Sequence, residues 1–419
     1  MWKKVVCTYI ALVVIFTSLI VAVFAIPNSA VRDNVIVSAD QIDSEGIFFR
    51  VAGCPLWQID NMTDCMMLNM NVDAETASPL HAAMVNEYGK NFSGNRGYFD
   101  MAKDTRLLAE KGRGAVAEQF CYARYWHGYQ VLLRPLLTVF TYYQIRIINY
   151  ILLFSLAFVV LFLLWVRYSP QTSILFGIAL LLFGFPVVPL AIQFSTCFYI
   201  AFVAMIYVVK RRPTDKELPI FFFVVGAVTS YADFLTTPQI TLGLPMVVLI
   251  REFKEFKEFR EFKEFMEFKE FKEFRKVILL MMFWFAGYSL LWATKWVLAD
   301  IFTDADIWSS VAGNIALRTS STVITGGVET SIWTLLSDKV LLILAACVVV
   351  AVPCMYVYLK RSYIKDYGAL LAVALIVPLW FVLLKNHSIQ HIFFTWRAWI
   401  VTFYAFSLFV LLTLKLKRQ

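Results

Sequence analysis

Apolar residues in this chain are gathered into long runs that alternate with short polar connections. The first run covers residues 5–26, directly after Lys3 and Lys4, and is long enough to cross a bilayer as one helix. It exceeds the apolar part of a typical signal peptide, so we predict an uncleaved spanning helix over residues 1–26. Nine further apolar runs predict spanning helices over 145–166, 172–190, 194–209, 218–232, 238–250, 276–297, 338–358, 366–384 and 397–414. The pattern therefore predicts an all-α membrane protein with about ten transmembrane helices.

The longest polar segment lies between the first two predicted spans, over residues 27–144. Its length allows a small lobe of short helices on the membrane surface. Arg124, His127 and Arg134 are spaced so that they share one polar stripe on an amphipathic helix at the end of this lobe. Pro135 is expected to stop or kink that helix. The stripe either faces a lipid phosphate or lies in the interface with its cations among the headgroups.

Basic residues predict how the chain is oriented in the membrane. With ten spans and a cytoplasmic N-terminus, every strongly basic short loop falls on the cytoplasmic side: Arg167, 210–212, 251–275, 360–361 and 415–418. The lobe, the loop 298–337 and the loop 385–396 then lie outside a plasma membrane, and both chain ends lie inside. Helices two to six occupy 145–250, and helices seven to ten lie within 276–419. The net charge of +8 follows from this orientation and does not indicate nucleic-acid binding.

A low-complexity repeat of Glu, Phe and Lys fills residues 252–275. Its period of three residues differs from the 3.6 residues of a helical turn, so the phenylalanines of a helix would wind round its whole surface. No single apolar face results. We interpret the segment as a tandem expansion at the inner membrane surface, and we expect changes in its length to be tolerated.

Two carboxylates in the polar lobe are the candidate catalytic groups. Asp60 and Asp64 are four residues apart and share one face if the segment is helical. One is expected to act as a general base, and a divalent cation, Mg or Mn, is a candidate ligand of the pair. The simpler interpretation is that Asp60 caps the start of a helix. Asp40 and Asp43 compete for the catalytic role.

Polar residues of the later outer loops are candidate ligands for a phosphate. His387 and His391 are four residues apart, which suits either zinc or a phosphate, but no third zinc ligand is near in sequence. Lys295 lies between two tryptophans and is also explained as a cation reaching the interface. The full set of predicted substrate-binding residues is Arg124, His127, Arg134, Asp233, Lys295, Arg318, His387, His391 and Arg397.

Several familiar signatures are absent from the sequence. It contains no Walker A motif, no GxGxxG motif followed by an acidic residue and no GxSxG elbow, so nothing predicts a bound nucleotide or a serine hydrolase. Cys54, Cys65 and Cys121 share the polar lobe, where a disulfide between two of them is an open alternative.

The overall arrangement resembles integral membrane glycosyltransferases of the GT-C fold. The shared features are a cytoplasmic N-terminus, a long acidic segment after the first span and about ten spans with polar outer loops. Residues 60–64, 122–129 and 386–391 also resemble uncharacterised bacterial membrane proteins of this type. The resemblance implies a polyprenyl-phosphate-linked sugar donor, a glycan or lipid acceptor, and an acid of the first outer segment as base or metal ligand. In this fold the acid often lies closer to the first span, which keeps Asp40 and Asp43 in competition.

Other functions fit the same pattern. A multi-pass transporter or lipid flippase of an envelope polysaccharide pathway is the main alternative, although charges in the middle of the spans are nearly missing. An acyltransferase that uses the outer histidines and a non-catalytic assembly protein are further alternatives.

Overall fold

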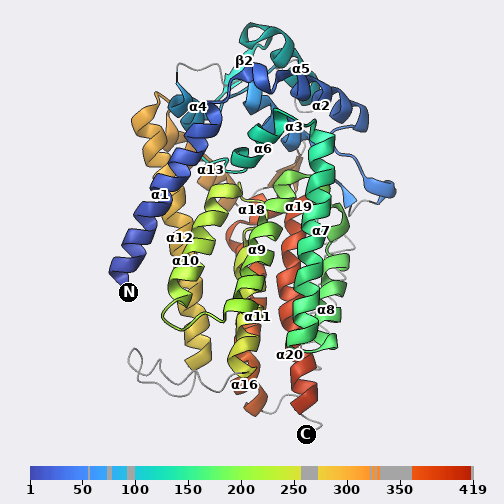
Figure 1. Cartoon of the computed structure of the whole chain (residues 1–419), viewed down its shortest axis with the longest axis vertical. Helices are drawn as coiled ribbons and strands as arrows, with labels where there is room; N and C mark the ends of the chain where they lie inside the picture. The colour runs from blue at the N-terminus through green and yellow to red at the C-terminus, as the bar shows by residue number, and fades with distance from the viewer. Residues whose placement is uncertain are drawn as a thin grey trace.

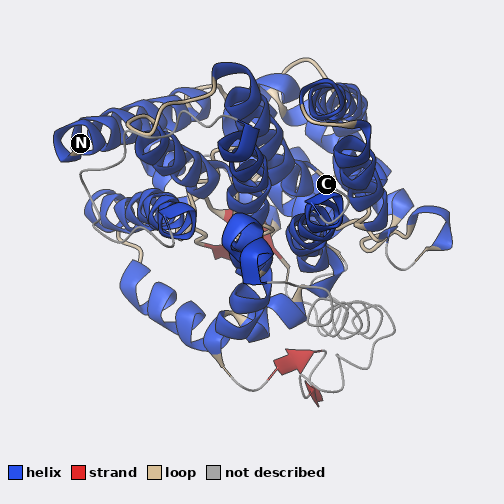
Figure 2. Ribbon diagram, turned by 90° about the horizontal axis from the view of Figure 1, so that it is seen from below, coloured by secondary structure: helices blue, strands red, loops and turns tan. Residues whose placement is uncertain are grey.

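The structure is a computed structural model that describes residues 1–54, 57–72, 78–91, 100–255, 272–320, 323–325, 328–330 and 361–416. It is mostly helical, as predicted (Figure 1). A lobe of short helices covers one end of a layer of long helices, and the C-terminus lies at the opposite end. Figure 2 shows the long helices end on, with strands as a minor component. The strands pair in two short antiparallel hairpins, β1 (Tyr88–Lys90) with β2 (Glu118–Phe120) and β3 (Val323–Thr325) with β4 (Val328–Thr330).

Within the described ranges, five helical segments are long and apolar enough to cross a membrane, which indicates a membrane-embedded protein. They are α1 (Trp2–Phe24), α7 (Tyr142–Arg167), α9 (Ile192–Arg211), most of α12 (Lys272–Phe302), and the last segment, formed by α19 (Ile392–Thr395), the 3-10 turn η9 (Trp396–Trp399) and α20 (Ile400–Leu416). Shorter apolar helices are α8 (Pro170–Leu182), α10 (Leu218–Ala232) and the pair α16 (Arg361–Ala374) and α17 (Ile376–Leu383). The predicted span 338–358 lies outside the described residues. The count of ten crossings and the orientation stay predictions.

One predicted span is interrupted. The sequence predicts a helix over 172–190, but α8 ends at Leu182, and η6 (Phe185–Leu190) is a 3-10 turn. Gly184 adopts a left-handed conformation at the break (φ 71°), and the turn contains two prolines. Asn149 of α7 donates from Nδ2 to the Pro189 carbonyl at 2.7 Å, which satisfies a carbonyl that the broken helix leaves free.

The predicted amphipathic helix that carries Arg124, His127 and Arg134 is wrong in its first half. Only α6 (Gln130–Leu137) is helical, whereas residues 121–129 form turns and loop. His127 has a positive φ of 53°, which no α-helix allows. Its neighbour Gly128 packs so tightly that an added Cβ would lie 2.4 Å from the Tyr231 ring. Tertiary packing against α10 therefore overrides the helical spacing, and Arg134 alone of the predicted cations lies on α6.

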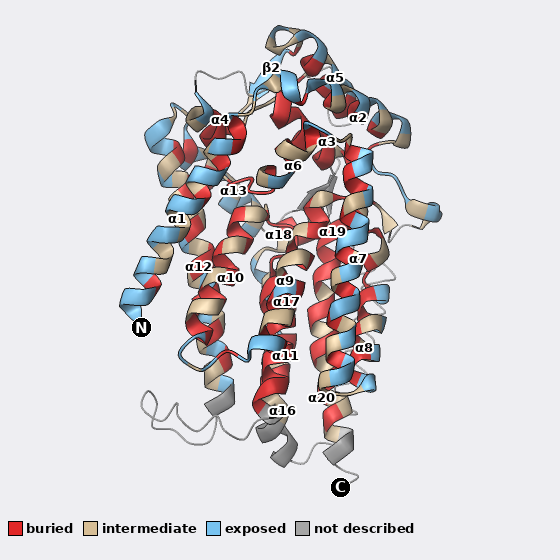
Figure 3. Cartoon of the chain, viewed as in Figure 1, coloured by how far each residue is buried: buried red, intermediate tan, exposed pale blue. Residues whose placement is uncertain are grey.

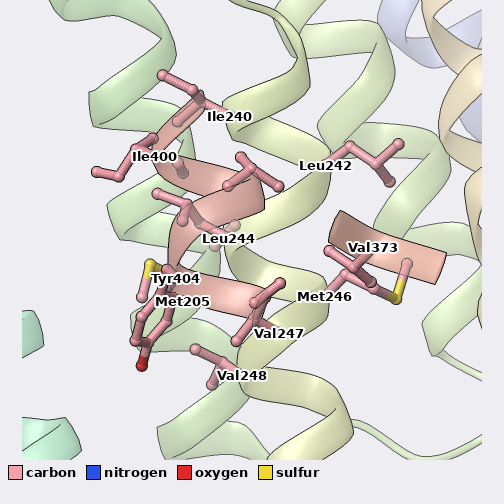
Figure 4. Packing of buried hydrophobic residues seen from close by; sticks show 14 of the residues in the cluster. Met205, Ile240, Leu242, Leu244, Met246, Val247, Val248, Val373, Ile400 and Tyr404 are labelled. Atoms are coloured by element: carbon pink, nitrogen blue, oxygen red, sulfur yellow. The ribbon is translucent and has the colours of Figure 1, made fainter. Parts of the chain in front are cut away.

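Buried apolar side chains fill the centre of the helical layer. Figure 3 shows buried residues along the inner helices, while α1 and α7 keep exposed stripes on the outside. Ile240, Leu244 and Val247 of α11 (Gln239–Glu255) pack in one cluster with Ile400 and Tyr404 of α20 (Figure 4). Such close packing holds helices together where lipid supplies no hydrophobic driving force between them.

The closest helix crossing joins α10 to α12 and depends on two glycines. A Cβ added at Gly226 would lie 2.0 Å from the Trp284 carbonyl oxygen, and one added at Gly287 would lie 2.0 Å from the Phe223 carbonyl oxygen. Each helix therefore presents its backbone to the other, as small residues allow in membrane helix pairs.

The lobe contains α2 (Arg32–Glu45), α3 (Asn61–Val72), α4 (Pro79–Val85) and α5 (Met101–Lys111), followed by α6. Short 3-10 turns connect them: η1 (Asn28–Ala30), η2 (Val51–Gly53) and η5 (Arg113–Ala115). Two further helices, α13 (Ile307–Thr319) and α18 (Lys385–Gln390), follow α12 and α17 in the chain and pack on each other. The lobe lies at one end of the long helices, with α13 below it (Figure 1).

The helices on both sides of the repeat have their own anchors. Glu252 of α11 accepts hydrogen bonds from Arg167 at 3.0 and 3.1 Å and from Tyr168 at 2.6 Å. Lys276 of α12 pairs with Asp215, and its ammonium group lies 3.9 Å from the centre of the Phe253 ring. Residues 256–271, the greater part of the repeat, lie outside the described residues.

Candidate functional site

Asp60 caps the beginning of α3. Its Oδ1 accepts from the Thr63 backbone N–H at 3.1 Å, and its Oδ2 accepts from the Thr63 hydroxyl at 2.6 Å. This is the N-cap geometry that the simpler interpretation predicts. The side chain is buried, and burial raises its pKa, while the Thr63 hydrogen bonds act in the opposite direction. Gln193 of α9 donates to the Asp60 carbonyl at 3.1 Å and so fixes the cap against the membrane layer.

Asp64 follows one turn later and pairs with Arg146 of α7. Arg146 Nη2 lies 3.4 Å from Asp64 Oδ2 and 2.6 Å from Asn61 Oδ1, while Nη1 donates to Glu45 at 2.7 Å. Arg146 thereby joins α7 to both α2 and α3. The Arg146 Nε is buried and has no hydrogen-bond partner.

The protonation of Asp64 is balanced close to neutral pH. Burial raises its pKa to about 7, and the Arg146 charge limits that rise. Tyr142 also interacts with this carboxyl group, yet Asp64 Oδ1 has no hydrogen-bond partner of normal geometry. A carboxyl group with a pKa near neutrality can act as a general base.

Arg397 lies on the other side of the α9 N-terminus. It donates from Nη1 to the Phe393 carbonyl at 2.9 Å and from Nη2 to the Gln58 carbonyl at 3.3 Å. Its guanidinium lies 4.4 Å from the centre of the Phe194 ring. The side chain is buried, and no described carboxylate forms an ion pair with it. Of the predicted residues, the structure therefore brings together Asp60 and Asp64 at the beginning of α3, whereas Arg397 touches this segment only through the Gln58 carbonyl.

A lateral groove opens beside Arg146. It has a volume of about 300 Å³ and lies between the outer end of α7, the end of α2 with the loop after it, and Leu190 of η6. Tyr143, Ile147 and Ile151 form its α7 wall and are 50%, 45% and 61% exposed on the outside of the helical layer. Glu45 and Arg146 provide its polar end. The groove, defined by these residues, leads from the outside of the helical layer to Arg146, and the buried Asp64 pairs with Arg146 behind it.

The remaining predicted cations separate into two groups. Arg134 donates to the carbonyls of Ile26 and Asn71 and to Asn28, and burial lowers its pKa to about 10. Lys295 donates to the carbonyls of Ala83 and Met84 at 2.8 Å, which caps the last turn of α4. Backbone carbonyls thus occupy both cations, and these two residues hold the lobe on the helical layer.

The outer histidines and Asp233 also have structural partners. His127 bonds through Nε2 to the Tyr122 carbonyl and through Nδ1 to the Tyr129 hydroxyl, each at 3.0 Å, and burial lowers its pKa to about 3. Asp233 accepts from the backbone N–H groups of Leu235 and Thr236, at 2.9 and 3.0 Å, and forms the turn between α10 and α11.

A second cluster forms on the far side of the lobe's 121–129 loop. His387 bonds through Nε2 to the Leu235 carbonyl at 2.8 Å, and its ring centre lies 4.8 Å from that of His391. Burial lowers the pKa of His391 to about 4, and the charge of Arg318 contributes to this shift, so Arg318 lies in the same region. Arg124 bonds Ser310 of α13 at 2.9 Å. These residues do not contact Asp60 or Asp64 in the structure.

The side chains proposed for a metal and for a disulfide have other partners or are free in the described part of the chain. Thr63 engages both Asp60 oxygens, Arg146 engages one Asp64 oxygen, and no group of three His, Cys, Asp or Glu gathers in the described part of the chain. A Mg or Mn ion at this pair stays a prediction and enters no step below. Cys54, Cys65 and Cys121 are free thiols. The competing Asp40 pairs with exposed Arg106, and with Asp43 it lines a different hollow, between α2 and α5.

Sequence reasoning missed Arg146, although a signal for it was present. It is an arginine one turn inside an apolar run that starts a predicted span, and such a charge requires a partner. Its partners Glu45 and Asp64 lie more than eighty residues earlier. Comparison with known proteins finds no matching family model, no similar curated protein and no similar solved structure. The site is therefore understood from its own geometry.

Proposed function

We propose that this chain is a membrane glycosyltransferase that moves a sugar from a polyprenyl-phosphate donor to a glycan or lipid acceptor on the outer face of the plasma membrane. The observation that carries the proposal is the lateral groove, whose apolar α7 wall leads to Arg146 and the adjacent Asp64. This combination suits a ligand with a long apolar chain and an anionic head.

The donor lipid lies along Ile147, Tyr150 and Ile151, with its phosphate at Arg146. A guanidinium binds phosphate through two parallel N–H donors, and Arg146 has the unpartnered Nε available. Phosphate binding draws the guanidinium away from Asp64 Oδ2, which lies at the long distance of 3.4 Å. Asp64 is therefore freed from Arg146 only when the donor phosphate is bound.

The chemical step is a single displacement. The acceptor hydroxyl passes its proton to Asp64 while its oxygen forms a bond to the anomeric carbon of the sugar. The bond between that carbon and the phosphate oxygen breaks, and the lipid phosphate leaves with the electron pair. Arg146 offsets the charge that develops on the leaving phosphate. The anomeric configuration is inverted, so one carboxylate is sufficient.

The donor arm is tested by native mass spectrometry of the purified protein with a polyprenyl phosphate. Ile151→Trp fills the groove, whereas Leu152→Trp, an equally exposed position of the same helix outside the groove, serves as the matched control. We expect Ile151→Trp to remove most of the bound lipid and Leu152→Trp to retain it. Equal binding by both variants would contradict the placement of the lipid.

The catalytic arm is tested in cells whose only copy of the gene carries Asp64→Asn. We expect the surface glycan modification to be lost while the protein level stays normal, and Asp43→Asn, an exposed carboxylate outside the groove, to retain it. In a transfer assay the rate is expected to rise with pH through about 7, because the base acts in its deprotonated form. Full modification in the Asp64→Asn cells would reject this carboxylate as the base.

A further inference from the structure

A second set of cations lies away from the Asp64–Arg146 pair, around two tyrosines of the 121–129 loop. The Arg124 guanidinium lies 5.0 Å from the centre of the Tyr122 ring, and the Arg318 guanidinium lies 5.7 Å from that of Tyr125. The two tyrosine rings are 5.5 Å apart and meet edge to face. We call Arg124, Arg318, Tyr122, Tyr125 and His391 the Tyr122 site.

The positive charge of the Tyr122 site is not offset by the described residues. Both arginines act on Tyr122 electrostatically, and in the described ranges neither forms an ion pair with a carboxylate. By contrast, Glu45 and Asp64 offset the charge of Arg146. Two guanidiniums within reach of one ring are costly to hold together without an anion. An anionic ligand between the two guanidiniums would offset this charge.

The histidines beside this site are neutral. Burial and the Arg318 charge both lower the pKa of His391, to about 4, and that of His387 is also lowered. His387 bonds the Leu235 carbonyl through Nε2, so that nitrogen carries the proton. The His391 side chain forms no hydrogen bond with the described residues and stacks on the Phe394 ring, with ring centres 5.2 Å apart. It can therefore donate to or accept from a ligand without adding charge.

The site also remains open to a ligand. Tyr122, Arg318 and His391 are half-buried, which leaves part of each side chain accessible, while Tyr125 behind them is buried. Trp292 stacks on Tyr125 with ring centres 5.6 Å apart and holds it in place. A rigid aromatic wall flanked by two guanidiniums suits a ring that carries an acid group.

We propose that the Tyr122 site binds an anionic saccharide, with its carboxylate or phosphate between Arg124 and Arg318 and its ring against Tyr122. Anion binding here is independent of the reaction at Asp64. The assignment of this saccharide as the acceptor, however, rests on the proposed glycosyltransferase function. It would make the acceptor a uronic acid or a sugar phosphate.

The proposal is tested by titrating the full-length protein in detergent with glucuronate, glucose 1-phosphate and glucose, following its thermal midpoint. The wild type is expected to bind one or both anions saturably, and glucose far more weakly. Arg318→Gln should weaken anion binding on the order of 10- to 100-fold, since it removes a charged hydrogen-bond donor. Lys103→Gln removes an exposed cation of the same lobe and should bind as the wild type does.

Two further variants make the test decisive. Arg318→Lys keeps the charge but loses the planar fork, so it should bind more weakly than the wild type. Arg124→Gln provides the same test if Arg318→Gln does not fold. The proposal is overturned if the wild type binds neither anion, or if the folded variants bind as tightly as Lys103→Gln. Saturable binding together with an active Asp64→Asn variant would keep the Tyr122 site and reject the proposed catalysis.

Discussion

Replacing Arg146 by methionine removes the cation that pairs with Asp64 and Glu45 while keeping a long side chain at the position. The lost hydrogen bond to Asn61 costs about 1 kcal/mol. Glu45 is 24% exposed, so the loss of its pair adds less than about 1 kcal/mol. Asp64 is fully buried. The cost of leaving it without Arg146 depends on pH, because the carboxyl group can take up a proton.

The pH dependence follows from the pKa of Asp64. The pKa of Asp64 is about 7 in the folded protein, above its ordinary value of 3.8, so folding favours the protonated carboxyl group. The stability that this group contributes to the wild type is therefore lost as the pH rises from 3.8 to about 7. Without Arg146 the folded pKa rises further, and the loss continues above pH 7. Each pH unit there adds about 1.4 kcal/mol to the cost of the substitution. We expect Arg146→Met to cost about 2 kcal/mol near pH 6 and about 4 kcal/mol near pH 8.5.

The assay is equilibrium unfolding by SDS titration in mixed micelles at both pH values. Asp64→Asn provides the reference background, because its side chain cannot ionise. In that background Arg146→Met should cost the same at both pH values. The buried ion pair would be refuted if Arg146→Met, made in the wild-type background, cost the same at both pH values. A cost below about 0.5 kcal/mol at the higher pH would refute it as well.

Three further predictions concern stability. Asp60→Ala should cost about 1 kcal/mol and Asp60→Asn only a few tenths, because asparagine still caps α3; equal losses in SDS unfolding would contradict the cap. Gly287→Ala should cost about 1–3 kcal/mol by forcing α10 and α12 apart, whereas Gly313→Ala, on an open face of α13, should stabilise by about 0.5–1 kcal/mol. Deleting one or two whole repeat units within 256–271 should leave the thermal midpoint unchanged, since the flanking helices have their own anchors; a clear drop would show that the repeat supports the fold.

The sequence by itself determined the helical membrane character and several local features. Long apolar runs specify helices because a bilayer leaves no other way to satisfy the backbone of a single segment. The predicted spans 218–232 and 194–209 agree with α10 and α9 to within a few residues. The N-cap at Asp60 could also be predicted, because a cap needs only its own residue and the next turn.

Only the tertiary structure decided which side chains meet. The partners of Arg146 come from α2 and α3, and the 121–129 loop abandons its helical spacing because Gly128 must fit against Tyr231 of α10. It also separated the predicted phosphate ligands of the Tyr122 site from the two structural cations Arg134 and Lys295, and it placed none of them in the groove. Periodicity records how one segment presents its faces, whereas a site depends on how distant segments are packed, and that information is spread over the whole chain.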